Sequence, residues 1–376
     1  MTSQRVLLLA SFADSLINFR GPLIEELTAA GHEVHVCAPG LTANAALAKQ
    51  LRAFGAVMHE IPLSRTGTSP LADLRSLWRL FQLMRKIKPD LVLAYTIKPV
   101  VYGMIAGWLA GVERRFAMIT GLGYAFIGES NGKRGRTQLL ARALYRLALA
   151  RASGVFFQNP DDRELFERMG LIGETVPVTL INGSGVDLNR FEEQALPALP
   201  IRFLMIARLL GDKGVREYAA AARIVRSSHP KAEFHLVGGE DSNPDAIPLG
   251  EIEGWQKDGI LIWHGEVADV RPSLAEAHVY VLPSYREGTP RTVLEAMATG
   301  RPVITTDAPG CRETIVNGES GYLVPVRKSD PLASTMMRFV TDPKLVGRMG
   351  RAARERAVEK YDVRLVNRQI RDAMGL

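Results

Sequence analysis

The chain has 376 residues, more than a single hydrophobic core usually organises, so we expect two domains. Its composition, 47% hydrophobic and 23% charged, is that of an ordinary globular protein, and its net charge of +7 lies mostly in residues 1–192, with 22 basic against 16 acidic side chains. Two distant cysteines without neighbouring histidines argue against a disulfide framework and a zinc site, and no apolar run suits a signal peptide or approaches the ~20 residues of a spanning helix, so we expect a cytoplasmic chain.

Short apolar runs alternate with helical periodicity through the first half, which predicts a doubly wound parallel sheet. We expect strands at 6–10, 34–37, 91–94, 116–119 and 154–158, and helices at 21–30 and 47–54. Residues 12–20 are expected to form a loop, with Gly21 and Pro22 opening the next helix. The glycine-rich dinucleotide fingerprint is missing after the first strand, where Ser11 to Ser15 stand, and this argues against a nicotinamide oxidoreductase.

The second half repeats the pattern after a turn-rich linker, Asn182 to Asp187 followed by Glu192 to Pro200. Strands are expected at 203–207, 233–237, 261–264, 280–282 and 303–305, and the last two helices at 344–361 and 363–374. The alternation predicts a second sheet of the same kind.

The stretch from Pro283 to Gly300 is the most informative, because it places Glu287 and Glu295 eight residues apart around a helix start. We expect Thr289 to cap this helix and Pro290 to occupy its first position. The free N–H groups and the positive dipole end would favour a phosphate there, and both carboxylates could reach the same space. Alone, such a stretch is more often a surface helix with two solvated glutamates.

Two cations precede this stretch, at the turn from a strand into a helix. Arg208 follows the strand at 203–207 and Lys213 opens the helix, so both could point at one diphosphate. Gly238 and Gly239 end the strand at 233–237 and would let a ligand approach the backbone, although a plain tight turn explains them equally well. Because parallel strands present their carboxyl ends along one edge, we expect these features to converge.

Together these segments resemble the retaining nucleotide-sugar glycosyltransferases of family GT4, which have the GT-B architecture. The resemblance is carried by Ile206 to Arg208, Lys213-Gly214, Val237 to Gly239, Leu282 to Ser284, Glu287 to Pro290 and Glu295 to Gly300. It implies two Rossmann-like doubly wound domains facing a cleft, with residues 1–192 binding the acceptor and 193–360 the nucleotide sugar. It also implies that residues 361–376 form a helix that crosses back to the first domain.

The resemblance assigns roles in the donor site. It implies that Arg208 and Lys213 bind the donor diphosphate and support its departure, that Glu287 binds the sugar hydroxyls, and that Glu295 binds the ribose. Further donor-binding candidates are Gly239, Glu266, Gly288, Thr289 and Pro290. No Asp-x-Asp motif stands in a suitable loop, so we expect neither a metal nor another cofactor.

Loops of the first half are similar to those of bacterial undecaprenyl-diphosphate-sugar N-acetylgalactosaminyltransferases. The similar segments are Ser15 to Arg20, Thr96 to Pro99 and Ile119 to Gly123, and the acceptor-binding candidates in them are Asn18, Arg20, Lys98, Thr120 and Gly121. Some members of that subgroup have histidine or glutamate where this chain has lysine and threonine, so no general base is assigned. The implied reaction moves a hexose or N-acetylhexosamine, best UDP-GalNAc or a related UDP-sugar, onto a polyprenyl-diphosphate-linked sugar.

Two basic segments, 75–88 and 130–151, interleave cations with apolar and aromatic residues. Such helices suit an anionic bilayer, which predicts peripheral binding at the inner face of the cell membrane. Apolar faces that merely pack into the domain core explain the pattern equally well. Nucleic acid is not expected as a partner, because no recognition motif accompanies the cations.

Two other functions fit the same motifs. A GT-B sugar-nucleotide 2-epimerase would convert the donor without an acceptor, and a noncatalytic nucleotide-sugar binding protein would leave the motifs idle in chemistry.

Overall fold

The chain forms two compact units in the computed structural model, which describes residues 3–63, 70–122, 133–241, 243 and 245–376, with the backbone alone at 70 and 133–137. Unit 1 comprises Met1–Ser184 and Val366–Leu376, and unit 2 comprises Gly185–Leu365. The division falls between Ser184 and Gly185, whereas the linker pattern of the sequence suggested residue 192.

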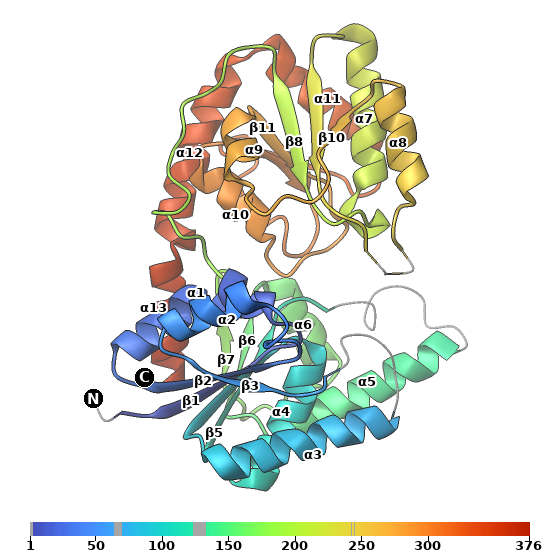
Figure 1. Ribbon diagram of the computed structural model, residues 1–376. Coiled ribbons are helices and arrows are strands. Elements are labelled where there is room, and N and C mark those ends of the chain that lie inside the picture. Colours follow the sequence, from blue (N-terminus) through green and yellow to red (C-terminus); the bar gives the residue numbers. More distant parts are fainter. Residues whose placement is uncertain (1–2, 64–69, 123–132, 242, 244) are drawn as a thin grey trace. The chain divides into compact units, whose positions relative to one another are not determined.

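Unit 1 is built on a seven-stranded parallel sheet with the strand order β3-β2-β1-β4-β5-β6-β7 (Figure 1). Its strands are β1 (Arg5–Leu9), β2 (Glu33–Ala38), β3 (Val57–Glu60), β4 (Leu91–Tyr95), β5 (Arg114–Ile119), β6 (Gly154–Phe157) and β7 (Val178–Leu180). Its helices are α1 (Asp14–Ala29), α2 (Ala45–Ala53), α3 (Pro70–Ile87), α4 (Ile97–Ala110), α5 (Lys133–Leu149) and α6 (Pro160–Arg168). One core contains side chains of α1 and α2, and the other those of α3 to α6, so helices cover both faces of the sheet.

The predicted loop at residues 12–20 is wrong, because α1 begins at Asp14 and contains Pro22 in its interior. An interior proline costs a helix about 3 kcal/mol. Burial of Leu16 before it, and of Leu23 and Ile24 after it, contributes about 1.5–3 kcal/mol for each side chain and outweighs that cost. The glycine-proline pair was therefore a misleading start signal.

Unit 2 is built on a six-stranded parallel sheet with the order β10-β9-β8-β11-β12-β13. Its strands are β8 (Arg202–Ile206), β9 (Glu233–Val237), β10 (Ile262–Trp263), β11 (Val279–Leu282), β12 (Val303–Thr306) and β13 (Gly321–Val324). Its helices are η2 (Gly211–Lys213, a 3-10 turn), α7 (Val215–Ser228), α8 (Leu249–Lys257), α9 (Arg271–Glu276), α10 (Arg291–Ala298), α11 (Ser329–Thr341) and α12 (Lys344–Tyr361). The predicted pair of doubly wound parallel sheets is confirmed.

The last helix, α13 (Val363–Met374), begins in unit 2 and continues into unit 1. Its apolar side chains Val366, Ile370 and Met374 are buried in the same core as α1 and α2. The expected return of the C-terminal helix to the first domain is therefore present.

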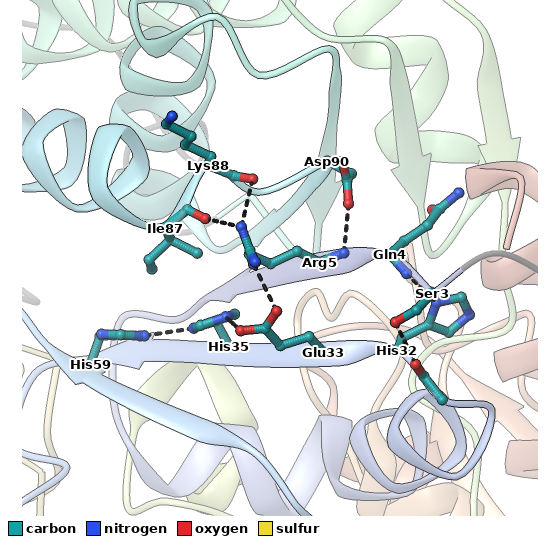
Figure 2. A network of polar contacts seen from close by, with 11 residues as sticks. Ser3, Gln4, Arg5, His32, Glu33, His35, His59, Ile87, Lys88 and Asp90 are labelled. Atoms are coloured by element: carbon teal, nitrogen blue, oxygen red, sulfur yellow. Dashed lines mark hydrogen bonds and ion pairs between the residues drawn. The ribbon is translucent and has the colours of Figure 1, made fainter.

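A polar network ties three strands of unit 1 near their amino ends, away from the edge where a ligand is expected (Figure 2). Arg5 of β1 lies 2.8 Å from Glu33 of β2, and the other oxygen of this carboxylate lies 2.9 Å from Nε2 of His35. Nδ1 of His35 lies 2.8 Å from Nε2 of His59 on β3, with the rings stacked 5.0 Å apart. Since one proton fills the bond between the rings, this arrangement requires at least one neutral imidazole.

Unit 2 has the same network at the equivalent strands. Arg202 of β8 lies 3.0 Å from Glu233 of β9, whose carboxylate lies 3.2 Å from Nε2 of His235. Nδ1 of His235 lies 2.9 Å from Nε2 of His264, which directly follows β10. The repetition shows that the two sheets share details of side-chain chemistry as well as topology.

Candidate active site

The centre of the candidate site is an ion pair between residues 74 positions apart. Lys213 ends the turn η2 that follows β8, and Glu287 lies in the loop that follows β11; Nζ and Oε1 are 2.6 Å apart. Both side chains are 15% exposed. Ser284 donates a hydrogen bond of 2.8 Å to the same carboxylate oxygen. The neighbouring strands β8 and β11 bring the two loops together, as their shared sheet edge predicted.

Two glycines make this close approach possible. Gly214, directly after the lysine, has φ +75°, and a Cβ there would lie 2.2 Å from the carbonyl oxygen of Pro283. Gly310 has φ +79°, and a Cβ there would lie 2.1 Å from the carbonyl oxygen of Glu287. Any side chain at either position would push the two loops apart, so the backbone fixes the ion pair.

Arg208 lies at the same edge but holds another carboxylate. Its guanidinium is 2.6 Å from Asp241, in the loop after β9, and its side chain is 50% exposed. Asp212 is close to both cations, since Lys213 and Arg208 each favour its charged form. Burial is nevertheless the larger effect and raises the pKa of Asp212. The structure thus gathers both predicted cations around one acidic residue.

Glu295 lies inside α10 and is only 5% exposed. Its carboxylate is paired with Arg291 at 2.7 Å, yet burial dominates and raises its pKa. Arg190 and Asp269 also act on this carboxylate, and both line a pocket of about 420 Å³ together with Thr299. The charges of Glu287 and Glu295 both add to burial in raising the pKa of the Tyr280 hydroxyl, so both glutamates act on one tyrosine.

The remaining donor candidates lie in the surrounding loops. Gly239 packs against Glu266, whose carboxylate would be 2.8 Å from a Cβ at that glycine. Gly288 is buried and Thr289 partly buried. Pro290 is the N-cap of α10 rather than its first residue, and its own side chain makes no capping hydrogen bond. The proline therefore lies one position before the one expected for it, while α10 begins at Arg291.

Sequence reasoning missed several side chains that shape the site. Asp241 pairs with an arginine, Ser284 donates to a glutamate, and the Tyr280 hydroxyl lies 2.6 Å from the hydroxyl of Thr292 and 3.1 Å from the carbonyl oxygen of Ile206. The tyrosine and serine read as ordinary strand-end residues, and the aspartate lies in a loop without a recognisable motif. In the described part of the chain, no group of three or more histidine, cysteine or acidic side chains has the geometry of a metal site.

Comparisons with known proteins agree with this geometry. A family model described as "Glycosyl transferase 4-like domain" matches residues 20–183, and one described as "Glycosyl transferases group 1" matches residues 200–342. The chain is a GT4 glycosyltransferase of the GT-B fold. Its sucrose-phosphate synthase neighbour from Thermosynechococcus elongatus has a TM-score of 0.80 at 21% identity, with 98% of each chain covered, and supports the fold.

Two curated relatives share this family. An N,N'-diacetylbacillosaminyl-diphospho-undecaprenol alpha-1,3-N-acetylgalactosaminyltransferase of Campylobacter jejuni is 28% identical, with 96% of both chains covered. A UDP-Gal:alpha-D-GlcNAc-diphosphoundecaprenol alpha-1,3-galactosyltransferase of Escherichia coli is 26% identical, covering 81% of this chain and 79% of the relative.

The acceptor candidates of this GT4 chain lie in unit 1 and are not equally accessible. Asn18 is exposed on α1, and Thr120 and Gly121 are partly buried after β5. Lys98, at the start of α4, pairs with Asp73. Gly123, which belongs to the third similar loop, lies outside the described residues.

Arg20 differs from its predicted role, because it is only 1% exposed. Its guanidinium lies over the ring of Tyr95, 5.3 Å from the centroid, and contacts the sulfur of Met118. This burial does not support a direct contact with an acceptor, and the side chain instead packs against the end of β4. A charged residue in a predicted loop suggested an exposed position for Arg20, whereas α1 begins earlier than predicted and places this side chain in the core.

An apolar surface with cations lies on α3 and α5, which flank α4 in unit 1 (Figure 1). The α3–α5 surface comprises the exposed side chains Leu71, Leu74, Trp78, Leu139, Leu140 and Leu147, which are 51–82% exposed. Arg75 and Arg79 of α3 and Arg146 of α5 are exposed among them. The part of the second basic segment before residue 138 lies outside the described side chains. Within the described residues, no helix is long and apolar enough to cross a membrane.

Proposed function

We propose that this GT4 chain is a retaining glycosyltransferase that moves a hexose or N-acetylhexosamine from a UDP-sugar, with UDP-GalNAc or a related UDP-sugar as the best candidate, onto a polyprenyl-diphosphate-linked sugar in bacterial surface glycan assembly. The ion pair of Lys213 and Glu287 at the carboxyl edge of β8 and β11 is the observation that supports it most directly. Both relatives are named as transferases to sugars on diphosphoundecaprenol, which supports the acceptor class.

In the proposed mechanism, the donor diphosphate binds between Arg208 and Lys213. Their charges stabilise the diphosphate as its bond to the sugar breaks, which is the step that needs most help. Glu287 accepts hydrogen bonds from sugar hydroxyls while it keeps the lysine oriented. The N–H groups of Gly288 and Thr289 add to the positive end of α10.

Glu295 is proposed to bind the ribose. Arg291 lies 2.7 Å from Oε1 of this carboxylate, and Oε2 is proposed to accept a hydrogen bond from a ribose hydroxyl. The neighbouring pocket of about 420 Å³ beside Arg190 and Asp269 offers room for the nucleoside side of the donor. Gly239 and Glu266 are proposed to border the donor from the loops after β9 and β10.

Retention of configuration is supported by the relatives' names. Both are named as forming alpha-1,3 linkages, and one uses UDP-Gal. UDP-galactose carries its sugar in the alpha configuration, so an alpha product means that the anomeric centre keeps its configuration. We propose the same outcome here, with the leaving diphosphate taking the proton of the attacking hydroxyl.

The acceptor is proposed to bind unit 1 through Asn18, Lys98, Thr120 and Gly121, while the α3–α5 surface rests on the inner face of an anionic membrane. The exposed leucines and Trp78 would enter the headgroup region, and each nearby cation contributes about 1 kcal/mol to binding. A lipid-linked acceptor would then reach the enzyme within the bilayer surface.

We also propose that transfer needs no divalent metal and no other cofactor, because the two cations already neutralise the diphosphate. Turnover in excess EDTA should match turnover in Mg²⁺. A loss of more than about tenfold in EDTA would assign part of that charge to a metal.

The decisive experiment incubates the chain with a panel of radiolabelled UDP-, GDP- and ADP-sugars and vesicles that contain polyprenyl diphosphate sugars. Label in the lipid phase, with an alpha linkage by NMR, is the expected result. Conversion of the donor without acceptor would indicate the sugar-nucleotide 2-epimerase. Binding of a nucleotide sugar without any conversion would indicate the noncatalytic binding protein.

A further inference from the structure

An ion pair joins the first turns of two neighbouring helices in unit 1. The Lys98 ammonium of α4 lies 2.8 Å from the Asp73 carboxylate of α3, and the side chains are 17% and 21% exposed. Burial and, after it, the charge of the same carboxylate raise the pKa of Tyr102 on α4. Since Lys98 and Tyr102 are four residues apart, they share one face of α4. Asp73 therefore holds Lys98 and also acts on a second side chain of α4.

The backbone beside this pair is strained. Thr96, directly after β4, has φ 70° and ψ 163°, a combination that a β-branched residue rarely adopts. Its hydroxyl oxygen is buried without a hydrogen-bond partner. Both features cost free energy at the carboxyl edge of a parallel sheet, which is where such sheets bind ligands. A loop with a structural role alone would not need to keep both costs.

The same turn of α3 also faces solvent with apolar side chains. Leu71 and Leu74, on either side of Asp73 in sequence, are 82% and 63% exposed and belong to the α3–α5 surface. One short helix turn thus carries both the carboxylate that holds Lys98 and part of the surface proposed to meet the membrane.

We propose that Asp73 is a positioning residue for the lipid-linked acceptor, which presents Lys98 to phosphate groups of that acceptor and ties this lysine to the membrane-facing turn of α3. The inference rests on the proposed function. The Lys98 ammonium has three N–H donors, so it can keep its bond to Asp73 and donate to a phosphate oxygen at the same time. Docking on the bilayer and orientation of Lys98 are then linked through one side chain.

The variant Asp73→Asn tests this proposal, because it keeps the shape of the side chain and removes its charge. We expect the KM for the lipid-linked acceptor to rise about tenfold, while kcat and the donor KM change less than about twofold. Lys98→Met should raise the acceptor KM at least as much, and the double variant should be no worse than Lys98→Met alone. Glu167→Gln, which breaks the exposed pair with Arg163 in the same unit, is the matched control and should leave the acceptor KM unchanged.

Two forms of the acceptor, one water-soluble and one in anionic vesicles, distinguish the acceptor diphosphate from lipid headgroups as the phosphate that Lys98 contacts. If Lys98 meets the acceptor diphosphate, the Asp73→Asn effect persists with a water-soluble, short-chain prenyl diphosphate sugar. An effect that appears only with anionic vesicles and is matched by weaker vesicle binding would assign the lysine to lipid headgroups and overturn the proposal. An unchanged acceptor KM, or losses that multiply in the double variant, would also overturn it. If the wild-type chain transfers no sugar at all, both this inference and the proposed function fail. If the wild type is active and Asp73→Asn has an unchanged acceptor KM, this inference alone fails.

Discussion

The ion pair of Lys213 and Glu287 predicts a stability coupling that can be measured without any substrate. Both side chains are 15% exposed, and the charged atoms are 2.6 Å apart. Removing one partner leaves the other charge largely buried, which costs about 3–5 kcal/mol for fully buried pairs. Residual solvent access places Lys213→Met near the lower end, at about 3 kcal/mol. Glu287→Gln should cost about as much, since it leaves the ammonium without its counter-charge.

The double variant Lys213→Met with Glu287→Gln removes both charges together. Its cost should be only about 1–2 kcal/mol above the wild type, so the singles and the double differ from additivity by several kcal/mol. As a matched control, Arg216→Met breaks a pair with Glu251 whose side chains are 48% and 32% exposed, and it should cost no more than about 1 kcal/mol.

Urea unfolding followed by tryptophan fluorescence measures these energies. Trp78 and Trp108 of unit 1 are 56% and 45% exposed, so replacing both by Phe leaves Trp255 and Trp263 to report on unit 2. Additive costs in the double variant would refute the reasoning, because they would mean that the two charges stabilise the fold independently. All three charge variants should lose transfer activity, whatever their stability.

Three further predictions follow from the structure. Burial lowers the pKa of His59 and His235 below 6.5, so the folded state binds these protons less tightly than the unfolded state. The free energy of unfolding should therefore be fully present above pH 6.5 and should fall as the pH drops from there through the lowered pKa values. His235→Gln should flatten the dependence of Tm on pH between 8 and 5, and a Tm that rises on acidification would contradict this prediction. Gly214→Ala should destabilise unit 2 by about 3 kcal/mol or more, because its Cβ would lie 2.2 Å from a carbonyl oxygen. The same variant should abolish UDP binding in calorimetry. Wild-type affinity for UDP would show that the turn can relax without cost. The double variant Trp78→Ser with Leu140→Ser should reduce co-sedimentation with anionic vesicles severalfold, while its turnover of a water-soluble acceptor stays unchanged. Co-sedimentation equal to that of the wild type would exclude the α3–α5 surface as the membrane contact.

Local signals predicted the elements of the donor site because each was strong by itself. Glycine after Lys213, proline before α10 and short apolar runs before each loop are all direct consequences of backbone sterics. Parallel pairing of β8 with β11 then places the lysine and Glu287 at one edge, so their contact followed from topology alone. The two sheets could be predicted for the same reason, although β3, β7 and β13 were not predicted.

Partners chosen by loop conformation could not be predicted. Arg208 pairs with Asp241 across 33 residues, through a loop that contains no regular element and no recognisable motif. Arg20 lies in the core because α1 begins about two turns before the expected start at Gly21. The earlier start depends on tertiary burial of Leu16 rather than on helix propensity. In both cases the outcome was decided by contacts between segments, to which a sequence pattern is blind.

Both cations assigned to the donor diphosphate hold carboxylates in the structure, which makes donor affinity a difference between two sets of ion pairs. For Lys213, the competing partner Glu287 is itself assigned to the sugar, so the lysine need only share its charge with the incoming diphosphate. For Arg208, the partner Asp241 has no role in the donor, so this bond must be given up. The arginine side chain is 50% exposed but the aspartate only 16%, so breaking the pair leaves a largely buried carboxylate and costs more than the roughly 0–1 kcal/mol of an exposed pair. Arg208 therefore binds the donor only where a bidentate contact with a phosphate exceeds that cost, while the aspartate keeps the arginine at the edge of the sheet in the absence of the donor.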